Sequence, residues 1–277
     1  MVTVHSVQEL SQAYKILSQE SVKVIAGGTD LMVLYTGGLS LPNNILDIWQ
    51  LNELRSISEE QNYLKIGALC TYTELINDKK VKEFAPSLVS ASRTIGAVQI
   101  QNRGTLGGNI VNGSPAGDSL PVLAAFDAEL ELGSARGTRR VAFNEFYTGY
   151  RQTVLASDEL LLNIFLPKQQ EKEKSDFYKV GTRAAQAISK VVMAVRATVN
   201  DNKIESIAIS LGSVAPTVIR ARVTEQMLTG AEITLELIEQ AKTALSQEVK
   251  PIDDIRSTEH YRRVVTGNLI AKFLRGF

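Results

Sequence analysis

Two glycine-rich bends, roughly eighty residues apart, constrain the fold of this chain more than any other feature. The first is Gly27-Gly28-Thr29-Asp30, which follows the apolar run Val22–Ala26 and precedes another apolar run. The second lies within NRGTLGGNIVNGSPAGD, residues Asn102–Asp118, and apolar chain resumes directly after it in Leu120–Phe126. Because glycine has no side chain, its backbone N–H groups can approach a ligand closely. The pair therefore predicts one long, phosphate-containing ligand that is held from two sides.

The second bend alone also fits a simpler interpretation, a tight turn between two strands. The first bend favours a phosphate site, because a strand, a glycine turn and a helix start direct free N–H groups and the helix dipole at an anion. Two standard nucleotide motifs are absent, since the chain has no G-x-G-x-x-G and no Gly-Lys-Ser/Thr after either bend. These absences argue against a nicotinamide-type Rossmann site and against a P-loop.

The size and charge of the chain exclude several classes of protein. Its 277 residues suggest roughly two domains at a prior of about 150 residues each. Thirty basic and thirty acidic side chains give a net charge of zero, which argues against nucleic-acid binding. No apolar run approaches the ~18 residues that a membrane span needs, and the N-terminus does not have the pattern of a signal peptide. We expect a cytoplasmic protein without a membrane span.

The scarcity of metal ligands limits the redox chemistry that the chain can carry by itself. Cys70 is the single cysteine, and the two histidines, His5 and His260, lie near opposite ends. Such a chain has no internal disulfide and cannot hold an iron–sulfur cluster or a zinc ion by the usual cysteine-rich ligation. Any redox group must therefore be organic or belong to a partner.

Local patterns in the first half predict helices and strands around the two bends. Ser6-Val7-Gln8-Glu9 has the spacing of a capping box and predicts a helix that ends near Glu20. Alternation of apolar and polar residues predicts a strand at Glu129–Leu132, with Arg136–Arg140 as the turn beyond it.

The most polar stretch of the chain, Lys168–Asp176, is either a solvated hairpin tip or a domain boundary. We place the boundary there and expect two domains, residues 1–170 and 171–277. Beyond it, Asn200–Lys203 separates two apolar runs and predicts a hairpin. Later helices, one of them starting at Glu259 with Ser257 as N-cap, predict an α+β arrangement with helices on one side of a sheet.

Five segments in order give the chain a clear resemblance to a known family, which covers nearly its whole length. It resembles the FAD-binding (medium) subunit of the molybdenum hydroxylases, the group of xanthine dehydrogenase and carbon monoxide dehydrogenase. The segments are AGGTDL (Ala26–Leu31), IQNRGTLGGN (Ile100–Asn109), SPAGD (Ser114–Asp118), YKVGTRAAQAISKV (Tyr178–Val191) and RSTEHYRRVVTGNL (Arg256–Leu269).

The resemblance implies an α+β fold, with a two-part FAD-binding domain of the PCMH (vanillyl-alcohol oxidase) type followed by a smaller flavoprotein domain of sheet plus helices. It implies FAD as cofactor, with the two bends around the diphosphate and Gly107 leaving room for a phosphate. Asp118 would accept hydrogen bonds from ribose or ribityl hydroxyls, or alternatively cap the helix that follows. Leu161 would form an apolar wall, and Lys179 would place a charge near the flavin ring or the phosphates. The implied contacts are Ala26, Gly27, Gly28, Thr29, Asp30, Leu31, Ile95, Thr105, Leu106, Gly107, Gly108, Asn109, Ser114, Asp118, Leu161 and Lys179.

The same resemblance implies partners, because the chain lacks the molybdenum and 2Fe–2S domains that single-chain xanthine dehydrogenases contain. We expect a molybdopterin-containing large subunit, a 2Fe–2S small subunit, and NAD+ as electron acceptor. The family's cysteine-rich cluster insertion, found in members of the benzoyl-CoA reductase type, is absent here. The substrate of the complex stays open among a purine, nicotinate, an aldehyde and carbon monoxide.

Two alternatives remain at this point. One is a self-contained FAD oxidase or reductase of the same flavin-domain class, which would need a catalytic Ser or His or a substrate arginine such as Arg183, Arg220 or Arg222. The other is a scaffold that has lost FAD, which the intact glycines and Asp118 disfavour.

Overall fold

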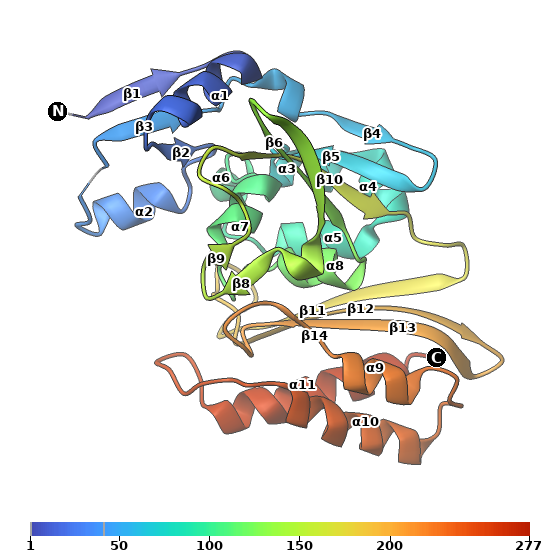
Figure 1. Ribbon diagram of the computed structural model, residues 1–277. Helices are drawn as coiled ribbons and strands as arrows, with labels where there is room; N and C mark the ends of the chain where they lie inside the picture. Colours follow the sequence, from blue (N-terminus) through green and yellow to red (C-terminus); the bar gives the residue numbers. More distant parts are fainter. Residues whose placement is uncertain (1, 41) are drawn as a thin grey trace.

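A polar segment between strands β10 and β11 separates two groups of sheets and helices (Figure 1). The computed structural model describes residues 2–40 and 42–277. Within these residues helices and sheets are segregated rather than alternating throughout, so the expected α+β class is confirmed. The first group, before the polar segment, contains both glycine bends.

A small parallel sheet opens the chain, with strand order β1-β3-β2. Helix α1 connects β1 to β2, and α2 connects β2 to β3, because parallel strands of one sheet need crossover connections. The expected capping box is wrong, because Ser6 ends strand β1 and its hydroxyl donates to Asp47 on β3. The N-cap of α1 is Glu9, whose side chain accepts no hydrogen bond from the backbone N–H groups of the helix. The bounds are β1 Thr3–Ser6, α1 Leu10–Gln19, β2 Lys23–Ile25, α2 Leu31–Thr36 and β3 Asn44–Asp47.

An antiparallel sheet of five strands follows, in the order β4-β5-β10-β6-β7. Strand β10 lies at its centre, and seven of its eight residues are buried. The predicted strand at Glu129 is confirmed, but the turn predicted at Arg136–Arg140 is wrong, since Arg139 and Arg140 belong to edge strand β7. That strand is almost entirely exposed, so it lacks the alternation that marks a half-buried strand. The bounds are β4 Ile57–Glu59, β5 Tyr63–Gly67, β6 Glu129–Ser134, β7 Gly137–Ala142 and β10 Leu160–Pro167.

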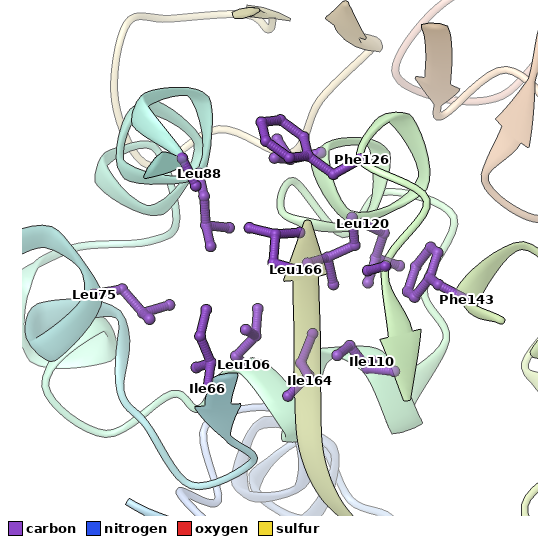
Figure 2. Packing of buried hydrophobic residues seen from close by; sticks show 14 of the residues in the cluster. Ile66, Leu75, Leu88, Leu106, Ile110, Leu120, Phe126, Phe143, Ile164 and Leu166 are labelled. Atoms are coloured by element: carbon purple, nitrogen blue, oxygen red, sulfur yellow. The ribbon is translucent and has the colours of Figure 1, made fainter. Parts of the chain in front are cut away.

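Short helices pack against this sheet and form the largest hydrophobic core (Figure 2). Leu106 and Ile110 of helix α7 point into this core beside Ile164 of β10 (Figure 2). The second glycine bend is therefore attached to packed structure at its helical end. The short elements are η1 Asn52–Leu54, α3 Tyr72–Asn77, α4 Lys79–Phe84, α5 Pro86–Arg93, α6 Val98–Gln101, α7 Leu106–Asn112, α8 Leu120–Ala125, η2 Phe143–Glu145, β8 Tyr147–Gly149 and β9 Gln152–Thr153.

A four-stranded antiparallel sheet, β11-β12-β13-β14, forms the second group. The predicted hairpin is confirmed, with Asp201 and Asn202 at positive φ in its turn. Helices α9–α11 cover one face, as expected, and α5 and α8 of the first group cover the other (Figure 1). The N-cap of α11 is Thr258, not Ser257. The bounds are β11 Glu173–Val180, β12 Val191–Asn200, β13 Lys203–Gly212, β14 Ile219–Arg220, α9 Arg222–Leu228, α10 Leu235–Glu248 and α11 Glu259–Leu274.

None of the helices in residues 2–40 and 42–277 has both the length and the apolar character that crossing a membrane requires.

Candidate functional site: a cavity between two glycine bends

The two glycine bends lie against each other, backbone to backbone. A Cβ atom on Gly27 would overlap the carbonyl oxygen of Arg103 and stand 2.6 Å from its carbonyl carbon. A Cβ on Gly104 would stand 3.3 Å from Oγ1 of Thr29. The close approach of the two bends therefore requires glycine at position 27. The glycine-rich composition of the bends had predicted that they meet.

A cavity of about 350 Å³ opens where the bends meet. Its wall combines both bends with the ends of strands β2, β5 and β10, so it joins the parallel sheet to the antiparallel one. Of the positions expected to contact a ligand, those in the wall are Ala26, Gly27, Gly28, Thr29, Asp30, Leu31, Ile95, Thr105, Gly107, Gly108, Asn109 and Leu161.

The first bend supplies hydrogen-bond donors without partners. It connects the end of β2 to the start of α2, and Gly28 has φ +74°, a conformation that favours glycine. The backbone N–H groups of residues 27–30 donate to no carbonyl or side chain within the described chain. Four adjacent donors on residues that line a cavity suit an anionic ligand with several oxygen atoms.

The second bend is attached to the turn after β5 by backbone hydrogen bonds. Leu106 donates to the Cys70 carbonyl at 3.0 Å, and Gly107 donates to the Ala68 carbonyl at 2.9 Å. A Cβ on Gly107 would lie 2.6 Å from that Ala68 oxygen. The absence of a side chain at Gly107 therefore serves packing against Ala68, and the room it leaves for a phosphate stays a prediction.

Thr105 keeps a hydroxyl proton available to the cavity. Its Oγ1 accepts a hydrogen bond from the N–H of Gly108 at 3.1 Å, which makes Thr105 the N-cap of α7. Asn109, one helical turn on, accepts from Ser119 at 2.8 Å through Oδ1 and keeps its amide nitrogen as a donor. The second bend thus offers side-chain donors where the first offers backbone donors.

Four expected contacts lie outside the cavity wall. Leu106 is fully buried in the core (Figure 2), and Ser114 lies in the loop beyond α7. Asp118 and Lys179 form a buried ion pair behind the wall, with Lys179 Nζ 2.5 Å from Asp118 Oδ2. Asp118 does not cap α8, because Ser119 occupies that N-cap position.

The Asp118 carboxyl group is unusual in its burial. Lys179 and the Thr94 hydroxyl both donate to Oδ2, whereas Oδ1 is buried and has no partner in the described residues. Burial raises the pKa of Asp118 to about 6, and the charge of Lys179 opposes that shift. An unpartnered buried oxygen costs free energy unless a ligand or water donates to it.

Tyr72 and Glu159 are among the polar side chains in the wall that sequence reasoning missed. Burial raises the pKa of the Tyr72 phenol, whose oxygen lies 3.4 Å from Oγ of Ser119. Glu159 is held by Arg139 at 2.7 and 2.8 Å, and this pairing lowers its pKa. Neither position lies in a motif, and both reach the wall through tertiary contacts, so no local pattern in the sequence marks them.

The arginines that a self-contained oxidase or reductase would need are used elsewhere. Arg183 donates to the carbonyl groups of Ala185 and Gln186 in its own loop. Arg220 and Arg222 pair with acidic side chains near α9. None of the three belongs to the cavity wall.

Comparison with known families divides the chain in two. Residues 1–169 match the family described as the FAD binding domain in molybdopterin dehydrogenase. Residues 176–277 match the CO dehydrogenase flavoprotein C-terminal domain.

Individual relatives match over nearly the full length. The chain is 33% identical over 261 residues to the xanthine dehydrogenase FAD-binding subunit of Escherichia coli O157:H7, covering 93% of this chain and 89% of that protein. It is 33% identical to the glyceraldehyde dehydrogenase medium chain of Sulfolobus acidocaldarius, covering 96% and 94%. Among solved structures, a chain of carbon monoxide dehydrogenase from Hydrogenophaga pseudoflava superposes with a TM-score of 0.94 at 28% identity, covering 98% and 95%.

Proposed function

Because the chain belongs to the FAD-binding subunits of the molybdenum hydroxylase family, we propose that it passes electrons from a 2Fe–2S partner subunit to NAD+. A molybdopterin-containing large subunit would oxidise the substrate and complete the complex. The support for these partners is that relatives matching over almost their whole length are named as medium chains or FAD-binding subunits of dehydrogenases.

The observation that carries the proposal is the contact of the two bends around one cavity. We assign the FAD diphosphate to the space between residues 26–31 and residues 105–109. The unpartnered N–H groups of residues 27–30 suit phosphate oxygens, and the hydroxyls of Thr29 and Thr105 add neutral donors. These donors suit a diphosphate by their chemistry, independently of any relative.

The remaining wall suits the less polar parts of FAD. Ile95 and Leu161 give apolar surface, and Tyr72 adds a buried aromatic ring. We assign the unpartnered Oδ1 of Asp118 to a hydroxyl group of the cofactor, because a carboxylate oxygen accepts such a bond well. Leu106, Ser114 and Lys179 would then support the site without touching FAD.

Bound FAD exchanges electrons between one-electron and two-electron carriers. The chain itself binds and orients the cofactor, and its apolar wall excludes water from part of it. NAD+ is proposed as acceptor because a flavin can release two electrons as a hydride. The division into domains 1–170 and 171–277 and the cytoplasmic location also remain proposals.

A native pull-down of the tagged chain tests the partners. We expect two co-purifying chains, one with molybdopterin and one with 2Fe–2S clusters, and FAD on the tagged chain. Under anaerobic conditions NADH should bleach the flavin absorbance of the complex.

The isolated chain is the matched control, and it should bind FAD but hydroxylate no substrate. Hydroxylation of a substrate by the isolated chain would contradict the proposed role. A native pull-down that recovers the tagged chain with FAD but with neither partner would contradict it as well. FAD that NADH does not reduce would contradict only the choice of acceptor.

A further inference from the structure

The single tryptophan of the chain, Trp49, is in contact with two arginine side chains from distant segments. It follows Ile48, a residue of the cavity wall, shortly after strand β3 ends. The guanidinium carbon of Arg55 lies 4.1 Å from the centroid of its ring, and that of Arg103 lies 3.8 Å from it. Distances of this size are typical of cation–π contacts. The indole ring thus joins the end of β3 to the second glycine bend, which contains Arg103.

Strand β3 connects this contact to the first glycine bend. It pairs with β2 in the parallel sheet, and β2 leads into Gly27. The pairing continues past the end of β3, because the N–H of Ile48 donates to the Ile25 carbonyl at 3.0 Å. Arg103 therefore approaches the first bend in two ways, since its backbone carbonyl faces Gly27 and its side chain covers Trp49.

The entry to the second bend has little packing of its own. Helix α6, which precedes the bend, has no buried residue, and Val98 at its start is 64% exposed. On the side of α3, the Thr73 hydroxyl holds the entry by donating to Oδ1 of Asn102 at 2.6 Å. In the described part of the chain the Arg103 guanidinium has no hydrogen bond or ion pair, so Trp49 is the contact that orders it. Trp49 thus holds the entry on the side of the sheet that carries the first bend.

We propose that Trp49 and Arg103 are positioning residues for the cofactor, because their stacking holds the second bend against the first and lets the donors of both reach one diphosphate. Arg55 fixes the tryptophan in turn. It donates to the carbonyl groups of Trp49 at 2.7 Å and of wall residue Leu69 at 3.3 Å. This inference rests on the proposed function, since it requires FAD between the bends.

The alternative role for Arg103 is direct attraction of the diphosphate by its charge. Stacking needs the ring of Trp49, whereas charge attraction does not. Charge attraction between exposed groups also weakens as salt screens it. Substitution of the ring and measurement at high salt therefore separate the two roles.

The test is calorimetric titration of FAD into flavin-free full-length protein. Arg103→Met and Trp49→Leu should each weaken FAD binding about fivefold, the contribution of one exposed cation–π contact. The double variant should bind no more weakly than the weaker single variant, because the two side chains act as one unit. Trp49→Phe keeps an aromatic face and should bind FAD nearly as the wild type does. The loss in Arg103→Met should persist at high salt.

Arg140→Met is the matched control. The Arg140 guanidinium carbon lies 3.7 Å from the ring centroid of Phe165, and neither residue belongs to the cavity wall. This variant should leave FAD affinity unchanged. Acrylamide quenching of Trp49 fluorescence checks the stacking itself in the absence of FAD. Arg103→Met should uncover the ring and increase the quenching, and Arg140→Met should not.

Wild-type affinity in Arg103→Met or in Trp49→Leu would overturn the inference and leave the proposed function intact. Additive losses in the double variant, unchanged quenching in Arg103→Met, or an equal loss in Arg140→Met would overturn it as well. A loss in Arg103→Met that high salt abolishes would do the same, because it would indicate charge attraction. Should Trp49→Leu fail to fold, the salt dependence and the quenching of Arg103→Met decide alone. Failure of the wild-type chain to bind FAD would overturn the proposed function and this inference together.

Discussion

Gly27→Ala is the sharpest perturbation of the contact between the two bends. Gly27 does not need a positive φ, so alanine is tolerated by the backbone and only the contact resists it. Its Cβ would stand 2.6 Å from the Arg103 carbonyl carbon, where ordinary contacts begin at 3.4 Å. The bends must therefore part by about 1 Å or more, and overpacking of this kind costs about 1–3 kcal/mol.

Separation of the bends should also reduce affinity for FAD. The unpartnered N–H groups of residues 27–30 would no longer face the same oxygens as the second bend. Loss of one hydrogen bond to a charged group costs about 1.5–3 kcal/mol, which raises Kd about tenfold to a hundredfold. Urea unfolding measures the stability, and titration of FAD into flavin-free protein measures the affinity.

Gly38→Ala is the matched control in the loop after α2. Gly38 has φ +98°, and a Cβ added there would have no atom within 4 Å. Alanine at this position would therefore strain the backbone without meeting any other residue. That penalty is about 1–2 kcal/mol, and FAD affinity should not change. Wild-type FAD affinity in Gly27→Ala, or an equal loss in Gly38→Ala, would refute the reasoning.

Three other variants have expected outcomes that follow from packing and charge. Gly107→Val should lower the urea midpoint of unfolding even without FAD, because its Cβ would meet the Ala68 backbone at 2.6 Å. An unchanged midpoint together with loss of FAD would indicate instead that the valine side chain occupies the space of a phosphate. Asp118→Asn should remove one contribution to the pH dependence of the free energy of unfolding. Urea unfolding at several pH values measures this dependence. Burial raises the pKa of Asp118 from 3.8 to about 6 in the folded protein, so its contribution to stability is present below pH 3.8 and is lost as the pH rises to about 6. If the free energy of unfolding changed equally with pH in the wild type and the variant across this window, the raised pKa of Asp118 would be contradicted. Arg220→Met should destabilise the protein by about 3 kcal/mol, because it removes the buried partner of the Glu225 carboxylate and leaves only the exposed Arg222 as its counter-ion. A cost below about 1 kcal/mol, typical of exposed pairs, would count against this reasoning.

Local sequence patterns were sufficient for elements whose two faces differ. The hairpin around Asp201 and Asn202 was predictable, because polar turn residues separate two strongly apolar runs. Strand β7 was not, because an exposed edge strand such as the one with Arg139 and Arg140 carries polar residues on both faces. The false capping box at Ser6 has a related cause, since a parallel strand took that residue into the sheet.

The candidate site was predictable where backbone conformation dictates residue type. Glycine bends are visible in a sequence, and the structure brings the first bend against Arg103 and Gly104 of the second. The reason for a particular glycine was not visible, as the contact of Gly107 with Ala68 shows. The partner of Lys179 was equally hidden, because only the packed sheets bring it to Asp118, 61 residues away.

The central claim is that the two bends together hold one diphosphate. A crystal structure of the chain with FAD tests it most directly. We predict density for the diphosphate within hydrogen-bond distance of the N–H groups of residues 27–30 and of the Thr105 hydroxyl. A dinucleotide bound elsewhere on the protein, or one whose diphosphate contacts only one bend, would contradict the claim.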